Sequence, residues 1–214
     1  MRFKDRTEAG QKLAHLLLKY RNQPGIIYPL PRGGVVLGVE VAKILHMPID
    51  LVIPRKIGHP RNPEYAIGAV AENGDMVRNE WEISRVDARW LEQQVAAERQ
   101  EAQRRHKRYL GQQAPLSVKG KTAILVDDGI ATGLTMQAAI RDLKLRQPAS
   151  IVVAIPLAPK DTAEQLGREV DEVVGLEITD NYRGSVGSYY DEFFQVSDEQ
   201  VINLLQAIAT NGDN

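Results

Sequence analysis

The stretch AILVDDGIATGLT, residues 123–135, decides the fold of this 214-residue chain. Its first four residues form an apolar run that predicts a buried strand. The run ends in two adjacent carboxylates, Asp127 and Asp128, and small residues then open an amphipathic helix predicted over 132–146. A strand that breaks into glycines and hydroxyls at a helix start presents free backbone N–H groups at the positive end of the helix dipole. The stretch therefore predicts an anion site.

Two carboxylates beside an anion site restrict what the ligand can be. They would repel a phosphate unless they face a neutral, hydroxyl-rich part of the same molecule. A phosphorylated sugar satisfies both halves, because its phosphate can lie on the turn while its ribose hydroxyls donate to Asp127 and Asp128. An ordinary strand-to-helix turn, with Asp128 or Thr132 as a helix cap, is the alternative explanation of the same residues.

Residues 126–135, VDDGIATGLT, resemble the phosphoribosyl pyrophosphate (PRPP) signature of type I phosphoribosyltransferases. The resemblance spans roughly residues 5–205 and implies an α/β fold, an open parallel sheet flanked by helices. It also implies one phosphoribosyltransferase domain over residues 1–214. Within that domain we expect a flexible catalytic hairpin loop at 55–80, a long inserted helix at 84–110 and a small C-terminal hood at 180–196.

Strands and helices alternate along the chain, which argues for a parallel sheet that is covered on both faces. Strands are predicted at 25–28, 48–53, 121–126, 150–155 and 170–175. Helices are predicted at 5–21, 35–45, 84–110, 132–146 and 161–169, and from Ser197, with Gln200 as its capping partner, onward. Asn73-Gly74 predicts a hairpin turn inside the otherwise polar segment 54–79.

Composition excludes several classes of function. The chain has no cysteine, which rules out disulfides, thiolate catalysis and cysteine-bound metals. A net charge of −1 argues against a nucleic-acid partner, and the basic run 104–108 reads better as a solvated helix end. No apolar stretch has membrane-spanning length and residues 1–6 lack the apolar core of a signal peptide. We therefore expect a cytoplasmic protein without a membrane partner.

A second candidate anion turn, Pro31-Arg32-Gly33-Gly34, follows the first predicted strand. An arginine beside two glycines lets backbone amides approach an anion while the guanidinium grips it. A glycine turn with a surface arginine is the simpler alternative. Beside the signature at 126–135, this turn resembles the pyrophosphate loop of the family, which often contains a cis peptide that would fall here near Arg32-Gly33.

The segment after the strand predicted at 48–53 is rich in polar and charged side chains. A solvated excursion and a functional loop are both open explanations. Arg55-Lys56-x-Gly58 resembles the corresponding run of adenine phosphoribosyltransferases, which implies basic residues near the pyrophosphate. Glu64 and Tyr65 then fall in the region that can face the reacting centre.

The resemblance implies transfer of the phosphoribosyl group of PRPP to a nitrogenous base or similar acceptor, with Mg²⁺ and in the context of nucleotide salvage. The expected catalytic residues are Asp127, Asp128, Arg32, Lys56 and Glu64. The expected PRPP-binding residues are Arg32, Gly33, Gly34, Arg55, Lys56, Asp127, Asp128, Gly129, Ile130, Ala131, Thr132, Gly133, Leu134 and Thr135. The expected acceptor-binding residues are Leu157 and Ala158 after the fourth strand, and Tyr189 and Tyr190 in the hood. No direct protein ligand to the metal is expected, because Mg²⁺ is held mainly by PRPP.

The acceptor stays open. Hypoxanthine-guanine enzymes carry an acid where this chain has Ala131, which argues against that subgroup and is compatible with adenine or other acceptors. A PRPP-sensing regulator without transferase activity and a plain sugar-phosphate-binding module are the alternative functions. The apolar N-terminal helix could serve a homodimer, and the sequence does not determine the oligomeric state.

Overall fold

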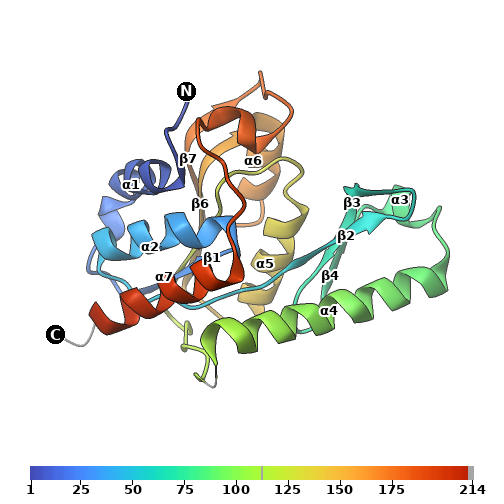
Figure 1. Cartoon of the computed structure of the whole chain (residues 1–214), viewed down its shortest axis with the longest axis horizontal. Coiled ribbons are helices and arrows are strands. Elements are labelled where there is room, and N and C mark those ends of the chain that lie inside the picture. The colour runs from blue at the N-terminus through green and yellow to red at the C-terminus, as the bar shows by residue number, and fades with distance from the viewer. Residues whose placement is uncertain (112, 212–214) are drawn as a thin grey trace.

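A four-stranded parallel sheet forms the centre of the computed structural model, which describes residues 1–111 and 113–211 and all of their side chains except those of Glu64, Thr210 and Asn211. The strand order is β1-β5-β6-β7. The bounds are Gly25–Pro29 for β1, Thr122–Val126 for β5, Ser150–Pro159 for β6 and Glu172–Thr179 for β7. Helices α1 (Arg6–Leu16) and α2 (Gly33–Leu45) cover one face, and α5 (Leu134–Leu145) and α6 (Lys160–Gly167) cover the other (Figure 1). This is the predicted fold class.

Each face of the sheet has its own core because successive side chains of a strand point to opposite sides. Ile124 of β5 packs in the cluster that contains Leu13 of α1 and Leu37 of α2. The next residue, Leu125, packs in the cluster that contains Ile140 of α5. Both faces are apolar, and this explains why the strands read as continuous hydrophobic runs.

The parallel register aligns the strand ends that carry the two candidate turns. Pro29, the last residue of β1, pairs with Val126, the last residue of β5. The N–H of Leu30 then donates to the carbonyl of Val126 at 2.8 Å. The turn at 31–34 and the acids at 127–128 therefore leave the sheet side by side, at the edge where open α/β sheets bind ligands.

The strand predicted at 48–53 is reduced to a single bridge, in which Ile49 pairs in parallel with Ile27. The N–H of Ile27 donates to the carbonyl of Pro48, and the N–H of Asp50 donates to the carbonyl of Ile27. The next bond of a parallel ladder would need the N–H of residue 29, which is a proline and has none, so the pairing stops there. The buried Asp50 carboxylate accepts hydrogen bonds from the backbone N–H of Leu51, at 2.8 Å, and of Leu116, at 3.0 Å.

The segment predicted as a loop at 55–80 contains a second sheet, antiparallel and ordered β2-β3-β4. Its strands are β2 (Arg55–His59), β3 (Asn62–Val70) and β4 (Met76–Arg78), followed by the short helix α3 (Glu80–Ile83) and the long helix α4 (Ala88–Leu110). We call β2, β3 and β4 the hairpin sheet. Asn73-Gly74 forms the predicted turn, since the N–H of Ala71 donates to the carbonyl of Asp75 at 2.8 Å.

The hairpin sheet is stable because it lies between two helices. Ile57, Ile67 and Val70 are buried against an apolar stripe of α4 that includes Trp90 and Val95. On its other side Ala69 and Val77 pack on α5. The thin apolar stripe of the long charged helix thus has a partner, and the two elements form one unit that projects from the main sheet (Figure 1).

The C-terminal part covers the carboxyl ends of the strands. The hood contains the short helix η2 (Val186–Tyr189), and the last helix is α7 (Asp198–Asn211). The predicted capping box is present, with Gln200 N–H donating to Ser197 Oγ at 3.2 Å and Ser197 N–H to Gln200 Oε1 at 2.8 Å. Near the N-terminus the short helix η1 (Leu18–Tyr20) follows α1. Among the helices that the structure describes, none is long and apolar enough to cross a membrane.

The contact between α4 and the hairpin sheet should depend on pH through His106. Its Nδ1 lies 2.9 Å from Glu72 Oε2, and this contact with the carboxylate raises the pKa of His106. Asp50 adds to the rise, while burial and Arg146 oppose it. The protonated histidine stabilises the contact fully when the pH is below about 6.5, the ordinary pKa of histidine. This contribution to stability disappears as the pH rises through the raised pKa of His106.

We therefore expect amide-exchange protection at residues 71–75 to fall up to about fivefold between pH 6 and pH 9. This factor corresponds to an ion pair that contributes up to about 1 kcal/mol. Hydrogen exchange, corrected for the intrinsic rate, measures this. The His106→Gln variant should lose the pH dependence, and an unchanged dependence would contradict the assignment to His106.

Candidate active site

The two acids follow β5 directly and are held by their own backbone. The N–H of Asp128 donates to Asp127 Oδ1 at 2.9 Å, and the Tyr190 hydroxyl donates to the carbonyl of Asp128 at 2.6 Å. Both acids are half-buried, and 15% of the Asp128 side chain is exposed. The pair is therefore fixed in direction and largely withdrawn from water.

This withdrawal controls the ionisation of the pair. Burial raises the pKa of Asp127 well above its ordinary value, and the charge of Asp128 raises it further, against the backbone N–H of Asp128 and the charge of Arg6. Burial also raises the pKa of Asp128, while the charge and the hydrogen bond of Arg6 lower it. Two adjacent carboxylates in one partly dry site favour a ligand that donates hydrogen bonds to them.

The turn at 31–34 lies against the two acids. Its cis peptide bond joins Pro31 and Arg32, one residue before the predicted place. A Cβ atom added to Gly33 would lie 2.0 Å from Asp128 Oδ2, and one added to Gly34 would lie 3.1 Å from Asp127 Oδ1. Glycine is required here because the backbone of one turn touches the carboxylates of the other. The two predicted turns thus form a single site.

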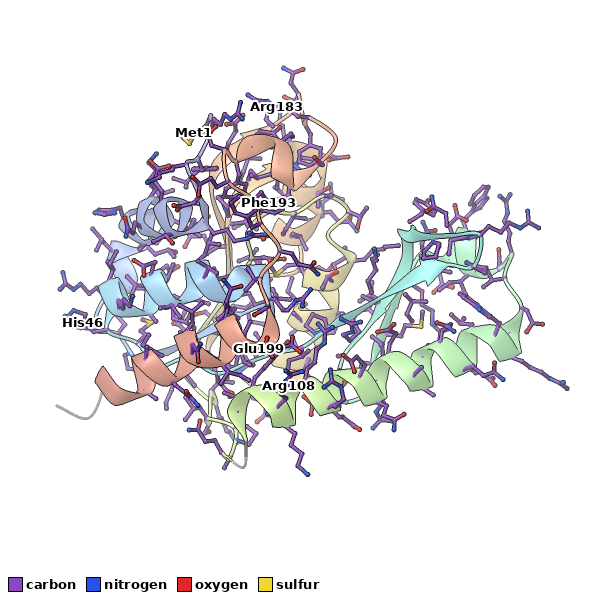
Figure 2. All side chains as sticks on the ribbon, in the orientation of Figure 1. Met1, His46, Arg108, Arg183, Phe193 and Glu199 are labelled. Atoms are coloured by element: carbon purple, nitrogen blue, oxygen red, sulfur yellow. The ribbon has the colours of Figure 1, made fainter. Side chains whose placement is uncertain are left out.

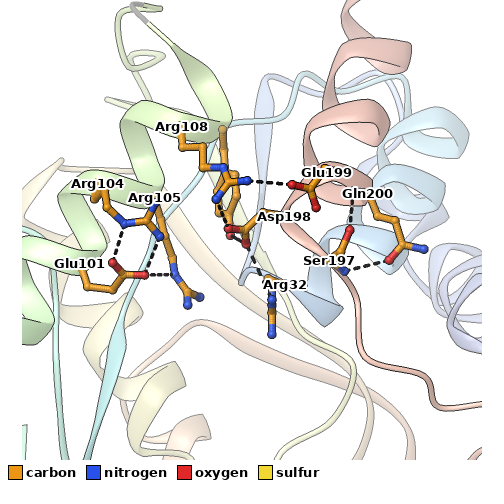
Figure 3. A network of polar contacts seen from close by, with 10 residues as sticks. Arg32, Glu101, Arg104, Arg105, Arg108, Ser197, Asp198, Glu199 and Gln200 are labelled. Carbon is orange, nitrogen blue, oxygen red and sulfur yellow. Dashed lines mark hydrogen bonds and ion pairs between the residues drawn. The ribbon is translucent and has the colours of Figure 1, made fainter.

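The side chain of Arg32 faces a different acid. Its Nη1 lies 3.8 Å from Asp198 Oδ1, at the start of α7. Asp198 also accepts from the Tyr109 hydroxyl at 2.6 Å and from Arg108 Nη1 at 2.7 Å (Figure 3). The bond from Tyr109 holds the pKa of Asp198 below its usual value, and Arg108 adds to this effect. Figure 2 shows Arg108 and Glu199 near each other where α4 passes α7, a pair at 2.9 Å.

The loop before α5 is shaped for close approach. Gly129 has φ +152°, and a Cβ there would lie 2.7 Å from Val186 of the hood and 3.1 Å from Leu157. The carbonyl of Ala131 accepts from the Thr162 hydroxyl at 3.0 Å, which fixes the loop to α6. Ala131 and Thr132 are exposed, as a phosphate site requires, and the first N–H groups of α5 point out of the helix. Beside them the structure places the other residues predicted for this loop: Ile130, Gly133, Leu134 and Thr135.

Sequence reasoning missed Arg6, the first residue of α1. Its Nε donates to Asp128 Oδ2 at 2.7 Å and its Nη1 to the carbonyl of Phe194 at 2.7 Å. The guanidinium lies 3.8 Å from the centre of the Phe193 ring. Figure 2 places Phe193 in the part of the hood between η2 and α7. No local pattern reveals the contact with Asp128, because 122 residues separate the two partners.

The hairpin sheet carries the other predicted basic residues. Arg55 Nε pairs with Glu98 of α4 at 2.8 Å, so α4, and not the acid turn, holds this side chain. Arg55 and the exposed Lys56 line a cleft of about 430 Å³ between β2 and α4. The backbone of Glu64 belongs to β3, and its side chain lies outside the described part of the chain.

The predicted acceptor residues are packed into the protein. Leu157 and Ala158 belong to β6, which extends to Pro159 and leaves no loop after residue 155. Both are fully buried, Tyr189 is also fully buried, and Tyr190 is 3% exposed. Tyr190 stacks on Phe193 with ring centres 4.9 Å apart. These rings support the acid turn, and their use as a stacking surface for an acceptor stays a prediction.

Comparison with known proteins identifies the family. The model of the phosphoribosyl transferase domain matches residues 3–192. The chain belongs to the phosphoribosyl transferase domain family. Both the family and the fold class expected from the motif at 126–135 are thereby confirmed.

Individual relatives agree with this family. Two Mycobacterium tuberculosis proteins, of strains CDC 1551 / Oshkosh and ATCC 25618 / H37Rv and each named "Putative phosphoribosyl transferase", are 36% identical over 205 residues, 95% of this chain. The match covers 46% of those proteins, so the chain spans about half the length of these curated relatives. The crystal structure of TT1426 from Thermus thermophilus is 39% identical, with a TM-score of 0.80, over 97% of this chain and 99% of that one.

The raised pKa of Asp127 predicts that this acid reduces stability. Between its unfolded and folded pKa values the folded protein retains a proton that the unfolded chain has released, so raising the pH favours unfolding. Asp127→Asn removes this penalty and keeps an oxygen that can accept from the N–H of Asp128. We expect an increase in unfolding free energy on the order of 1 kcal/mol at pH 8 and a smaller one at pH 5, measured by urea denaturation. A destabilised variant at pH 8 would contradict this account.

The contact between the two turns predicts a steric effect at Gly33. A methyl group there meets Asp128 Oδ2 at 2.0 Å and Arg6 Nε at 3.1 Å, so the ion pair must move. Gly33→Ala should lower unfolding free energy by about 1–3 kcal/mol. The control is Gly167→Ala in α6, whose added methyl would meet only ordinary contact, 3.9 Å from Val173. Equal unfolding free energies of the two variants would contradict the predicted steric effect at Gly33.

Proposed function

We propose that the chain transfers the 5-phosphoribosyl group of PRPP to a nitrogen of a base or similar acceptor and releases pyrophosphate. One observation carries the proposal: the Gly33 backbone lies against the Asp128 carboxylate, which brings the two predicted anion turns into one site. Membership in the phosphoribosyl transferase family supports the same activity.

The geometry suits a ligand with a hydroxyl-bearing centre and a phosphate at each end. Asp127 Oδ1 accepts from backbone and Asp128 Oδ2 from Arg6, which leaves the second oxygen of each carboxylate to face the 2′- and 3′-hydroxyls of a ribose. The exposed loop at 129–135 and the first turn of α5 receive the 5′-phosphate. The Gly33 amide, with Arg32, faces the pyrophosphate, while the N–H of Gly34 donates to the carbonyl of Leu30 at 3.1 Å and holds the turn.

The reaction then follows from charge. The bond from C1′ to the pyrophosphate oxygen breaks as a bond from C1′ to the acceptor nitrogen forms, and the acceptor nitrogen releases its proton. Positive charge develops on the sugar ring, and the carboxylates of Asp127 and Asp128 stabilise it. Arg32 and Lys56 stabilise the negative charge on the departing pyrophosphate. Glu64 remains a sequence-based candidate for a group at the reacting centre.

Magnesium enters this scheme with the substrate. Within residues 1–111 and 113–211, no three or more histidine or acidic side chains converge in a way that could hold a metal ion. Phosphate oxygens of PRPP are the hard donors that Mg²⁺ prefers, so we propose that the ion arrives bound to PRPP. The acceptor itself is defined only as a small molecule with a reactive nitrogen.

The test is pyrophosphate release from PRPP and Mg²⁺ with a panel of purines, pyrimidines and other nitrogen bases. We expect release with at least one acceptor and a loss of about 100-fold or more in Asp128→Asn. The matched control is Asp171→Asn, which can still accept from the N–H of Ile151 at the far end of β6. This control should retain the activity.

Two outcomes would contradict transfer. Tight PRPP binding without pyrophosphate release for any acceptor would indicate a PRPP-sensing regulator. Equal affinity for PRPP and ribose 5-phosphate would indicate a sugar-phosphate-binding module.

A further inference from the structure

Arg6 joins three parts of the protein that are distant in sequence. Its guanidinium contacts the Asp128 carboxylate, the Phe194 carbonyl and the Phe193 ring. Only 11% of the Arg6 side chain is exposed, and its bond to Asp128 forms in a poorly hydrated place where such a bond is strong. Its bond to the Phe194 carbonyl lies at the surface. One cation therefore connects α1, the acid turn and the part of the hood that follows η2.

The N-terminal backbone fixes Arg6 in this position. The N–H of Phe3 donates to the carbonyl of Tyr189 at 2.8 Å, and the N–H of Asp191 donates to the carbonyl of Phe3 at 2.8 Å. These bonds hold the chain before α1 alongside the hood. Because Asp5 then caps the helix by accepting from the N–H of Glu8 at 2.9 Å, Arg6 begins the first turn facing the site.

The charges around Asp128 also give Arg6 a distinct role. The charged and titratable groups that act on Asp128 are Arg6, Asp127, Tyr190 and Tyr182. Burial raises the pKa of both tyrosines, so they stay neutral at physiological pH. Arg6 is thus the cation that opposes burial at Asp128 and the like charge of Asp127.

We infer that Arg6 is a positioning residue of the candidate site: it orients the Asp128 carboxylate and fastens residues 193–194 to it. The consequence for PRPP rests on the proposed function. Arg6 occupies Oδ2, so Asp128 presents its other oxygen to the ligand in the ionised state. Because Arg6 also contacts residues 193–194, it couples their position to the protonation state of Asp128.

The first experiment needs no ligand. The carboxyl ¹³C resonance of Asp128 is titrated by NMR in the wild type, in Arg6→Gln and in Arg6→Lys. We expect the pKa of Asp128 to be higher in Arg6→Gln, with Arg6→Lys intermediate because it keeps the charge and loses the fork. Backbone amides of residues 191–196 should exchange faster in Arg6→Gln, measured by hydrogen exchange.

The control is Arg2→Gln, which removes an exposed ion pair with Asp191 between the same two segments and leaves Asp128 untouched. It should match the wild type in both measurements. An Asp128 pKa that is the same in Arg6→Gln and Arg2→Gln, in folded protein, would overturn the inference whatever the outcome of the transferase assay.

PRPP binding by calorimetry gives a second measurement. Arg6→Gln should bind PRPP about 10-fold more weakly than Arg2→Gln near pH 6, and this deficit should shrink as the pH rises and Asp128 ionises without help. A deficit that does not change with pH would contradict a role through Asp128. If neither the wild type nor Arg2→Gln bound PRPP, the proposed function would fail, whereas the NMR titration would still decide the role of Arg6.

Discussion

The site depends on keeping two neighbouring carboxylates at the end of a buried strand. Burial and mutual repulsion both oppose their ionisation, and the protein answers with a backbone N–H at Asp127 and a guanidinium at Asp128. The second oxygen of each carboxylate is, in our proposal, directed at the ligand that binds between the turns. At Asp127 the raised pKa predicts a lower stability than an amide would give.

The parallel sheet makes this arrangement precise. Since Pro29 and Val126 are paired, the turn after β1 and the acids after β5 leave the sheet at the same level. Gly33 then touches Asp128 without any intervening side chain. Around this contact lie the hood, through Val186 against Gly129, and α7, through Asp198 toward Arg32. The site is therefore built from strand ends whose spacing the backbone fixes.

The sequence was most informative where the pattern is local. The strand before Asp127 and the turn at Asn73-Gly74 follow from apolar runs and turn chemistry in a few consecutive residues. The prediction of a strand at 48–53 was wrong because Pro29 of the neighbouring strand has no N–H to continue the ladder, and the segment itself does not reveal which strand it will pair with. Within 55–80 the hairpin around Asn73-Gly74 was predicted, whereas strand β2 and the packing of the sheet on α4 were missed because α4 comes later in the chain. Arg6 was missed because its meaning depends on an acid 122 residues away.

Because α4 is attached to α7 at one end, a rotation at that end displaces the other end of the helix most. At 23 residues α4 is about 35 Å long, and its C-terminal end is tied to α7 through Arg108 and Tyr109. The hairpin sheet packs along the same helix on one side, and on its other side Ala69 and Val77 pack on α5. A rotation of about 10° at the tied end would sweep the far end of α4 through about 6 Å. The same rotation beside Asp198 and Arg32 would move Glu98, which lies about halfway along α4 and pairs with Arg55, by about 3 Å.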